Sequence, residues 1–325
     1  MANKLISIVI SAYNEEDNVG ALYQALQDSL AKVKKVDFEF IYVDDGSSDK
    51  TYQNCLALQK KDVRVKIVQL KRNFGHEIAM TAGMDYAKGD AVIFMDADLQ
   101  HPPVYIPQMI ELWQQGKEIV LTKRVDNKDT SALHKFCAKT FYWVLNKLSE
   151  TKIMESAPDF RLLDRKYVDF LKGFNEQDRL FRGLLSWVLP KENVALIDFV
   201  APERFSGESK YNFTKSLHLA LNSIMQFSVL PLRLATYLGL ISALAALLLG
   251  AYVFVEHFFL HNPTPGYATI MVTVVFLGSV QLICLGIIGE YIGKIHMEVK
   301  KRPLYMADYV EKPAMKGKTH AKKDI

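Results

Sequence analysis

Cysteine is scarce in this sequence, and the few cysteines form no pattern. Cys55, Cys137 and Cys284 are the only three in 325 residues, and they are widely separated. This spacing offers neither a disulfide framework nor a cysteine-rich metal site. We therefore expect three reduced thiols, as in a cytoplasmic protein, and assign them no role.

The N-terminal part lacks two signals that would have changed the interpretation. No Gly-x-Gly-x-x-Gly follows the first apolar run, so a dinucleotide-dependent oxidoreductase is excluded. That run, residues 5–10, is too short for a secretory signal peptide, and acidic residues 15–17 stand where a small-residue cleavage site would be needed.

A large excess of either charge is also absent. Lys and Arg total 40 against 36 Asp and Glu, which gives a formal net charge of +4. This value is modest for a nucleic-acid-binding protein, so no nucleic-acid partner is expected. The lysine-rich end, residues 316–323, is expected to be a disordered tail that touches an anionic membrane surface.

Two long segments have no charged residue at all. Residues 234–255 and 267–289 are each long enough to cross a hydrocarbon core as a helix. The alternative is a pair of buried core helices, but such helices seldom exceed about 14 residues without a polar face. We predict transmembrane helices over about 234–256 and 267–290, joined as a hairpin because residues 261–266 are rich in helix breakers.

The distribution of Lys and Arg predicts which way this hairpin crosses the membrane. The loop between the helices has no basic residue, whereas basic residues flank the hairpin on both outer sides. The positive-inside rule then places both termini and the large N-terminal part in the cytoplasm of a multi-pass inner-membrane protein. The flanking residues are Arg204, Lys210, Lys215 and Arg233 before the hairpin and Lys294, Lys300, Lys301 and Arg302 after it.

The first 121 residues alternate apolar β-branched runs with helical periodicity. Strands are predicted at 6–10, 38–43, 65–70, 91–95 and 118–121, and helices include 18–30 and 51–59. This alternation predicts an α/β fold with a doubly wound, mostly parallel sheet. The expected organisation is a catalytic domain over 1–212, a juxtamembrane amphipathic helix over 213–232, two transmembrane helices within 233–293 and a basic tail over 294–325.

Polar or acidic residues follow three of the predicted strands, where the ligand site of such a sheet lies. Asp96 and Asp98 come directly after the apolar run 91–95. If the extended geometry continues, both carboxylates face the same way, and with the Gln100 amide oxygen they suit Mg²⁺ or Mn²⁺. An Asp-x-Asp alone is more often a solvated turn, but the preceding buried strand favours a metal site.

The other two loops have a structural and a functional interpretation. Asp44 and Asp45 begin a turn in which Ser48 or Asp49 would cap the next helix. The turn does not explain the paired aspartates, since one carboxylate could accept hydrogen bonds from a base or a ribose. In the first loop, Glu15 suits the N-terminus of a helix.

Together these segments resemble the family 2 glycosyltransferases with a GT-A fold. The resemblance rests on SAYNE (11–15), VDDGSSD (43–49), RNFGHE (72–77) and MDADLQHPP (95–103). DFRL (159–162) and RFSGESKY (204–211), followed by two membrane helices, are similar to the polyprenyl-phosphate branch, which includes bactoprenol glucosyltransferases and dolichol-phosphate mannose synthases.

The resemblance implies a role for each matching residue. Asp96, Asp98 and Gln100 would hold the metal on the donor diphosphate, and Asp159 would act at the acceptor as a base or a positioning group. The nucleotide-binding residues would be Ala12, Tyr13, Glu15, Asp44, Asp45 and Ala97. The residues near the acceptor phosphate or lipid would be Arg124, Arg161, Arg204, Ser209 and Lys210. For the acceptor group, simpler alternatives are a local Asp159–Arg161 ion pair and binding of lipid head groups.

The implied reaction is an inverting transfer of glucose or N-acetylglucosamine from a UDP-sugar to undecaprenyl phosphate. Two alternatives stay open: a processive polysaccharide synthase, disfavoured because Gln-x-x-Arg-Trp and further membrane helices are absent, and a non-catalytic membrane scaffold that binds a nucleotide sugar. Membrane lipids are expected partners, and a small-residue face at Gly286, Gly289 and Gly293 favours a homo-oligomer.

Overall fold

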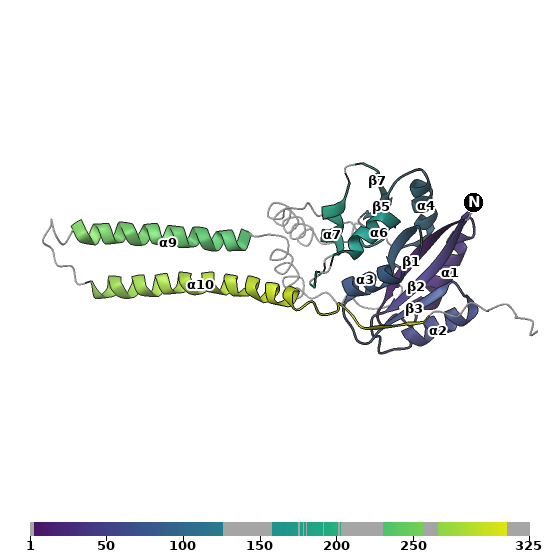
Figure 1. Cartoon of the computed structure of the whole chain (residues 1–325), viewed down its shortest axis with the longest axis horizontal. Helices are drawn as coiled ribbons and strands as arrows, with labels where there is room; N and C mark the ends of the chain where they lie inside the picture. Colours follow the sequence, from purple (N-terminus) through teal and green to yellow (C-terminus); the bar gives the residue numbers. More distant parts are fainter. Residues whose placement is uncertain are drawn as a thin grey trace, which may run out of the picture. The chain divides into compact units, whose positions relative to one another are not determined.

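The computed structural model of the chain describes residues 3–125, 158–174, 176–177, 179, 181–190, 192–200, 202, 230–255 and 266–310. These residues fall into two compact units. One unit contains the sheet and residues from 302 onward, and the other contains the two long apolar helices (Figure 1). Of the residues proposed for the site, Arg204, Ser209 and Lys210 lie outside the described part of the chain.

The first unit is built on one eight-stranded sheet with the order β7-β5-β6-β4-β1-β2-β3-β8. Neighbours among β1 to β4 run parallel, as do β5 and β7, whereas β6 and β8 run antiparallel to their neighbours. The strands are β1 Lys4–Ala12, β2 Val36–Asp44, β3 Val65–Leu70, β4 Ala91–Asp96, β5 Ile119–Arg124, β6 Arg161–Asp164, β7 Val194–Phe199 and β8 Ala307–Val310.

Helices cover both faces of this sheet. The helices of the first unit are α1 Asn18–Leu30, α2 Thr51–Lys61, α3 His76–Tyr86, α4 Ile106–Gln114, α6 Arg165–Lys172 and α7 Phe181–Val188, with a short 3₁₀ turn η1 at Pro103–Tyr105. Alternate residues of β1 pack into the two hydrophobic cores, one on each face of the sheet. Ile8 belongs to the first core cluster, under α1, α2 and α4, and Val9 belongs to the second core cluster, under α3, α6 and α7. Burial on both faces explains why the central strands read as continuous apolar runs.

The predicted α/β class is confirmed, and all five predicted strands form. Three further strands, β6, β7 and β8, were not predicted. One of them, β8, differs from the expectation of a simple basic tail over 294–325. It pairs with β3 in register Val68↔Tyr309, and Tyr309 stacks on Tyr86 with ring centroids 4.4 Å apart.

The second unit contains α9 Leu230–Val255 and α10 Tyr267–Val299, which lie side by side (Figure 1). Spans of 22 and 28 residues within them are long and apolar enough to cross a membrane, with mean hydropathy of 2.0 and 2.3. Both predicted membrane helices therefore form, and α10 continues nine residues beyond the predicted end at 290. Of the predicted juxtamembrane helix, residues 213–229 lie outside the described residues, and 230–232 already belong to α9.

Two glycines provide a test of how tightly α3 packs on the sheet. A Cβ at Gly83 would lie 2.2 Å from Val9 Cγ1, whereas a Cβ at Gly20 in α1 would meet nothing within 4 Å. We expect Gly83→Ala to destabilise the protein by about 1–3 kcal/mol through overpacking. Gly20→Ala, the matched control, should be neutral or stabilising by about 1 kcal/mol. Urea unfolding of the detergent-solubilised chain compares them, and a neutral Gly83→Ala would contradict the packing shown here.

Candidate active site

Three polar strand ends meet at one edge of the sheet. β1 pairs with β2 on one side and with β4 on the other, so that Ala12 lies beside Asp44 and Ser11 beside Asp96. The carboxyl ends of these strands therefore bring the first, second and fourth predicted loops together, as the doubly wound topology requires.

Asp96 is the last residue of β4 and is held from two sides. Ser11 Oγ donates a hydrogen bond to Asp96 Oδ1 over 2.8 Å, and His76 Nδ1 lies 3.4 Å from the same oxygen. The backbone N–H of Asp96 donates to His101 Nδ1 over 3.0 Å. The carboxylate is 30% exposed, so it is fixed in position and still open to a ligand.

The residues after Asp96 leave the strand at once. β4 ends at Asp96, Leu99 has a φ of 61°, and Asp98 Oδ1 accepts a hydrogen bond from the Gln100 N–H over 3.0 Å. The premise that extended geometry aligns the two carboxylates is therefore wrong, because the chain turns between them. The turn keeps Asp98 and Gln100 half-buried near the strand end, while Ala97 is buried and bonded through its N–H to the Ser11 carbonyl.

Among the described residues, no group of three or more His, Cys, Asp or Glu side chains forms a ready metal cage. This fits a Mg²⁺ or Mn²⁺ ion that takes one or two carboxylates from the protein and further oxygens from a bound diphosphate. Asp96, Asp98 and Gln100 supply hard oxygen donors of that kind, so the donor set fits the predicted metal.

A buried carboxylate lies next to this edge. β6 runs antiparallel to β4 with Phe94 opposite Arg161, and continuing that register places Asp159 beside Asp96. Thr122 Oγ in β5 donates to the Phe160 carbonyl over 2.7 Å and fixes the adjacent backbone. Asp159 is only 2% exposed.

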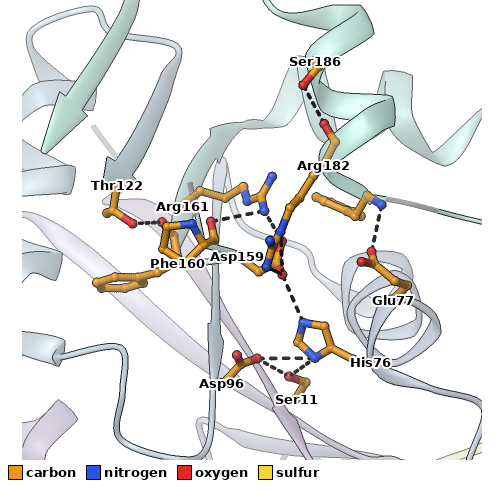
Figure 2. Close-up of polar contacts among 12 residues, drawn as sticks. Ser11, His76, Glu77, Asp96, Thr122, Asp159, Phe160, Arg161, Arg182 and Ser186 are labelled. Atoms are coloured by element: carbon orange, nitrogen blue, oxygen red, sulfur yellow. Dashed lines mark hydrogen bonds and ion pairs between the residues drawn. The ribbon is translucent and has the colours of Figure 1, made fainter. Parts of the chain in front are cut away.

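Three cationic side chains surround Asp159 (Figure 2). Arg161 pairs with its Oδ1, Arg182 Nη2 lies 2.8 Å from its Oδ2, and His76 Nε2 lies 3.3 Å from the same Oδ2. Burial by itself would raise the pKa of Asp159, but Arg161, His76 and Arg182 hold that pKa well below its usual range. Asp159 is therefore ionised at neutral pH and is a poor proton acceptor.

His76 connects the two carboxylates (Figure 2). Burial by itself would lower the pKa of His76, but Asp96, Asp159 and Glu77 outweigh it and raise that pKa to about 9. With both ring nitrogens protonated, Nδ1 faces Asp96 and Nε2 faces Asp159. The imidazolium thus offsets part of the negative charge between them.

Glu77 holds the helix that carries Arg182. Its Oε2 accepts a hydrogen bond from the N–H of Phe181, the first residue of α7, over 2.8 Å. Arg182 follows directly, and its guanidinium reaches Asp159 (Figure 2). The start of α3 therefore positions both His76 and the N-terminus of α7.

The loop after β2 contacts the loops that follow β1 and β3. The Asp45 carboxylate accepts hydrogen bonds from the N–H groups of Phe74 and Gly75 over 2.7 and 2.9 Å. Gly46 has a φ of 67°, and a Cβ there would lie 2.4 Å from the Arg72 backbone carbon, so only glycine fits. Asp45 and Gly46 therefore fix the segment that ends in His76.

Asp44 is completely buried beside this loop. One carboxylate oxygen accepts from the Ser47 N–H over 3.1 Å, and the other has no hydrogen-bond partner among the described residues. Burial raises the pKa of Asp44 and also that of Asp45. Of the two predicted caps of α2, Asp49 accepts a hydrogen bond from the Thr51 N–H over 2.9 Å.

The remaining predicted residues lie as follows. Tyr13 is 40% exposed at the loop after β1, and the Glu15 carboxylate accepts from Asn18 Nδ2 over 2.6 Å. Arg124 ends β5 with an exposed side chain, and β6 separates β5 from β4 in the sheet.

Sequence reasoning assigned no role to His76, Glu77 or Arg182. His76 and Glu77 belong to one of the segments that carried the resemblance, and their place at the start of the helix after β3 was the available signal. Arg182 had no such signal, because only folding brings residue 182 to Asp159.

Carboxylates, a polar turn and a cationic cluster thus meet at the carboxyl edge of a doubly wound sheet. The chain belongs to glycosyl transferase family 2, whose family model matches residues 7–171. A second family model, described as the GtrB C-terminal hairpin, matches residues 230–295, which include α9 and most of α10. The sheet unit thus has the GT-A fold that the resemblance implied.

Several curated relatives match almost the whole chain. An uncharacterised glycosyltransferase of Synechocystis sp. is 44% identical over 93% of this chain and 94% of its own length. A prophage-derived bactoprenol glucosyl transferase of Shigella flexneri is 41% identical over 93% of this chain and 96% of its own. A prophage bactoprenol glucosyl transferase homologue of Escherichia coli K12 is 39% identical over 94% of this chain and 99% of its own length.

Solved structures resemble the chain more distantly. Glucosyl-3-phosphoglycerate synthase from Mycobacterium tuberculosis, in complex with Mn²⁺, UDP and glucosyl-3-phosphoglycerate, is 16% identical. The match covers 68% of this chain and 78% of that one with a TM-score of 0.45, a likeness too slight to support an argument about the site.

The buried cluster predicts a large difference between two aspartate variants. Asp159→Asn would leave Arg161 and its neighbours buried without their counter-charge, which should cost about 3–5 kcal/mol of unfolding free energy. Asp308→Asn breaks an ion pair with Lys71 whose side chains are 54% and 45% exposed, and should cost about 0–1 kcal/mol. Urea unfolding at neutral pH measures both, and equal small losses would contradict the arrangement.

The same variant has a defined pH dependence. The pKa of Asp159 is lower in the native state than in the unfolded chain. The contribution of ionised Asp159 to the free energy of unfolding is therefore fully present above the unfolded-state pKa of about 3.9, and it is lost as the pH falls through the native pKa. The stability gap between wild type and Asp159→Asn should therefore be full at neutral pH and shrink in acid.

Proposed function

We propose that this chain is an inverting polyprenyl-phosphate glycosyltransferase that transfers glucose from UDP-glucose to undecaprenyl phosphate. N-acetylglucosamine is the second candidate sugar. One combination carries the proposal: a family 2 catalytic sheet with a carboxylate cluster at its edge, and two apolar helices matched by the GtrB hairpin, in the same chain. The names of the bactoprenol glucosyl transferases that match over most of the chain support a polyprenyl phosphate acceptor and favour glucose.

The donor would bind at the edge formed by β1, β2 and β4. Asp96, Asp98 and Gln100 would hold Mg²⁺ or Mn²⁺ together with the diphosphate, and the ion would neutralise charge on the leaving nucleotide. The nucleotide would lie against Ala12, Tyr13, Glu15, Asp44, Asp45 and Ala97. The exposed Tyr13 ring supports a stacking role, and Asp45 would act chiefly by fixing the loop that it binds.

The acceptor would meet the cationic side of the site. A phosphate monoester has a second pKa near 6, so its attacking oxygen is already largely ionised at neutral pH. An ionised Asp159 that is paired with two arginines suits a positioning role, and its depressed pKa argues against a general base. Arg182, whose side chain is 39% exposed, would bind the acceptor phosphate while Asp159 holds its guanidinium in place.

In the proposed step, a phosphate oxygen of the acceptor attacks C1 of the sugar as the bond from C1 to the diphosphate oxygen breaks. UDP leaves with the bonding electrons, and attack from the opposite face inverts the anomeric centre. Arg161 contributes by keeping Asp159 ionised. Arg124, Arg204, Ser209 and Lys210 remain proposed contacts to the acceptor phosphate or to lipid head groups.

The protein would act as a multi-pass inner-membrane protein with its catalytic unit and both termini in the cytoplasm. Its product would be a lipid-linked sugar for decoration of a cell-envelope glycan. The apolar surface of α10 supports contact with membrane lipids, and a Cβ at Gly286, Gly289 or Gly293 would meet nothing within 4 Å, which leaves that face open to a second copy.

A donor panel tests the function directly. Membranes that contain the protein are incubated with radiolabelled UDP-glucose, UDP-N-acetylglucosamine and GDP-mannose, and lipid is then extracted. Label should enter the lipid fraction from UDP-glucose, and EDTA should abolish the transfer until Mg²⁺ or Mn²⁺ is restored. Lipid labelling from no donor would favour the scaffold, and polymeric product would favour the polysaccharide synthase.

Two substitutions separate the proposed roles of the carboxylates. Asp96→Ala should abolish transfer at every metal concentration, because the ion loses its fixed ligand. Asp159→Asn, assayed at a temperature at which it stays folded, should keep measurable activity that rises with acceptor concentration. Equal and complete losses in the two variants would count against this division of labour.

A further inference from the structure

Two aromatic rings are exposed on α6 and α7, and a third ring between these helices packs partly against the second core cluster. This aromatic patch consists of Phe170, Phe174 and Trp187. The Phe170 and Trp187 rings are stacked, with centroids 6.4 Å apart and planes at 15°, and Phe174 meets both edge-on. Phe170 is 51% and Trp187 62% exposed.

Core packing accounts for Phe174, but not for the exposed rings of Phe170 and Trp187. On α7, Leu184 and Leu185 are buried against the second core cluster, while Trp187 is exposed. On α6, Val168 and Leu171 are buried and Phe170 is exposed. Each helix therefore stabilises the fold with one set of side chains and presents aromatics with the other, where a soluble domain normally has polar residues.

A hydrogen bond ties the segment between α6 and α7 to the chain that follows α10. Gln177, between α6 and α7, donates a hydrogen bond from Nε2 to the carbonyl of Arg302 over 2.7 Å. Arg302 comes three residues after the end of α10 at Val299, and residues 300–302 are exposed and basic. Three residues of chain therefore separate the hydrogen-bonded Arg302 from the end of a helix that is long and apolar enough to span a bilayer.

We propose that the aromatic patch inserts into the interfacial region of the phospholipid bilayer that holds α9 and α10. Tryptophan favours that depth, because its ring is apolar and its indole N–H can bond to head groups or water. The basic residues 300–302, which follow α10, favour an anionic surface. Insertion would add a second attachment of the catalytic unit to the membrane and restrain the direction in which its active edge opens.

Tryptophan fluorescence of the full-length protein tests the insertion independently of the proposed reaction. The chain has three tryptophans, so the difference between wild type and Trp187→Phe isolates the emission of Trp187. Both proteins are reconstituted into phosphatidylcholine–phosphatidylglycerol vesicles, with or without lipids brominated close to the head group. We expect the brominated lipids to quench the Trp187 emission, because a tryptophan ring in the interfacial region lies at the depth of the head groups.

Two further variants keep the test specific. Phe170→Trp in the Trp187→Phe background moves the indole to the other exposed position of the patch and should restore quenching. Val63→Trp in the same background places the indole between α2 and β3, at a site that is 65% exposed. This variant should not restore quenching. Unquenched Trp187 emission would overturn the proposal, whether the ring is in water or covered by a second copy. Quenching of the Val63→Trp indole equal to that of Trp187 would also overturn it.

A kinetic measurement extends this test and rests on the proposed function. Phe170→Ser/Trp187→Ser should raise the KM for undecaprenyl phosphate in vesicles by about 3–10-fold through the lost interfacial contact. It should leave kcat with a short, water-soluble polyprenyl phosphate unchanged, and Val63→Ser should alter neither value. Loss of turnover with both acceptors would contradict a purely interfacial role, whereas quenching without any glycosyl transfer would leave the insertion standing and remove the proposed function.

Discussion

The candidate site depends on one buried ionic interaction, the contact of Asp159 with Arg161, Arg182 and His76. A carboxylate that is 2% exposed is stable only if nearby cations replace its lost hydration. Its partners come from β6, α7 and α3, so this single charge fixes three elements around the edge of the sheet. It also keeps the guanidinium groups of Arg161 and Arg182 near the strand end that carries Asp96.

His76 makes the donor and acceptor sides of this site one electrostatic system. Its ring lies between Asp96 and Asp159 and carries a positive charge at neutral pH. A divalent ion bound to Asp96 would bring a second source of positive charge to the same carboxylate and weaken its hold on the ring. A change of charge at Asp96 would therefore reach the cluster around Asp159 through the His76 ring, which lies 3.3 Å from Asp159 Oδ2.

The fold positions this cluster through close backbone contacts more than through long side chains. Gly46 lets the second loop touch the Arg72 backbone, and Asp45 then binds Phe74 and Gly75, so the first residue of α3 is set by backbone geometry. On the opposite sheet edge, β8 returns the chain after α10 to pair with β3. The chain therefore leaves the sheet unit before α9 and rejoins it after α10.

Local patterns in the sequence were enough to predict the α/β class, five strands, two apolar helices and the acidic strand ends, because apolar periodicity and charge-free length depend only on neighbouring residues. They could not predict β6 or the cluster around Asp159. That cluster joins residues 76, 96, 159 and 182, and an antiparallel strand of four residues decides that Asp159 lies beside Asp96. The sequence by itself determined which chemical groups the protein possesses, and the tertiary structure decided which charges share one site, because the energy of a buried charge depends on partners that are distant along the chain.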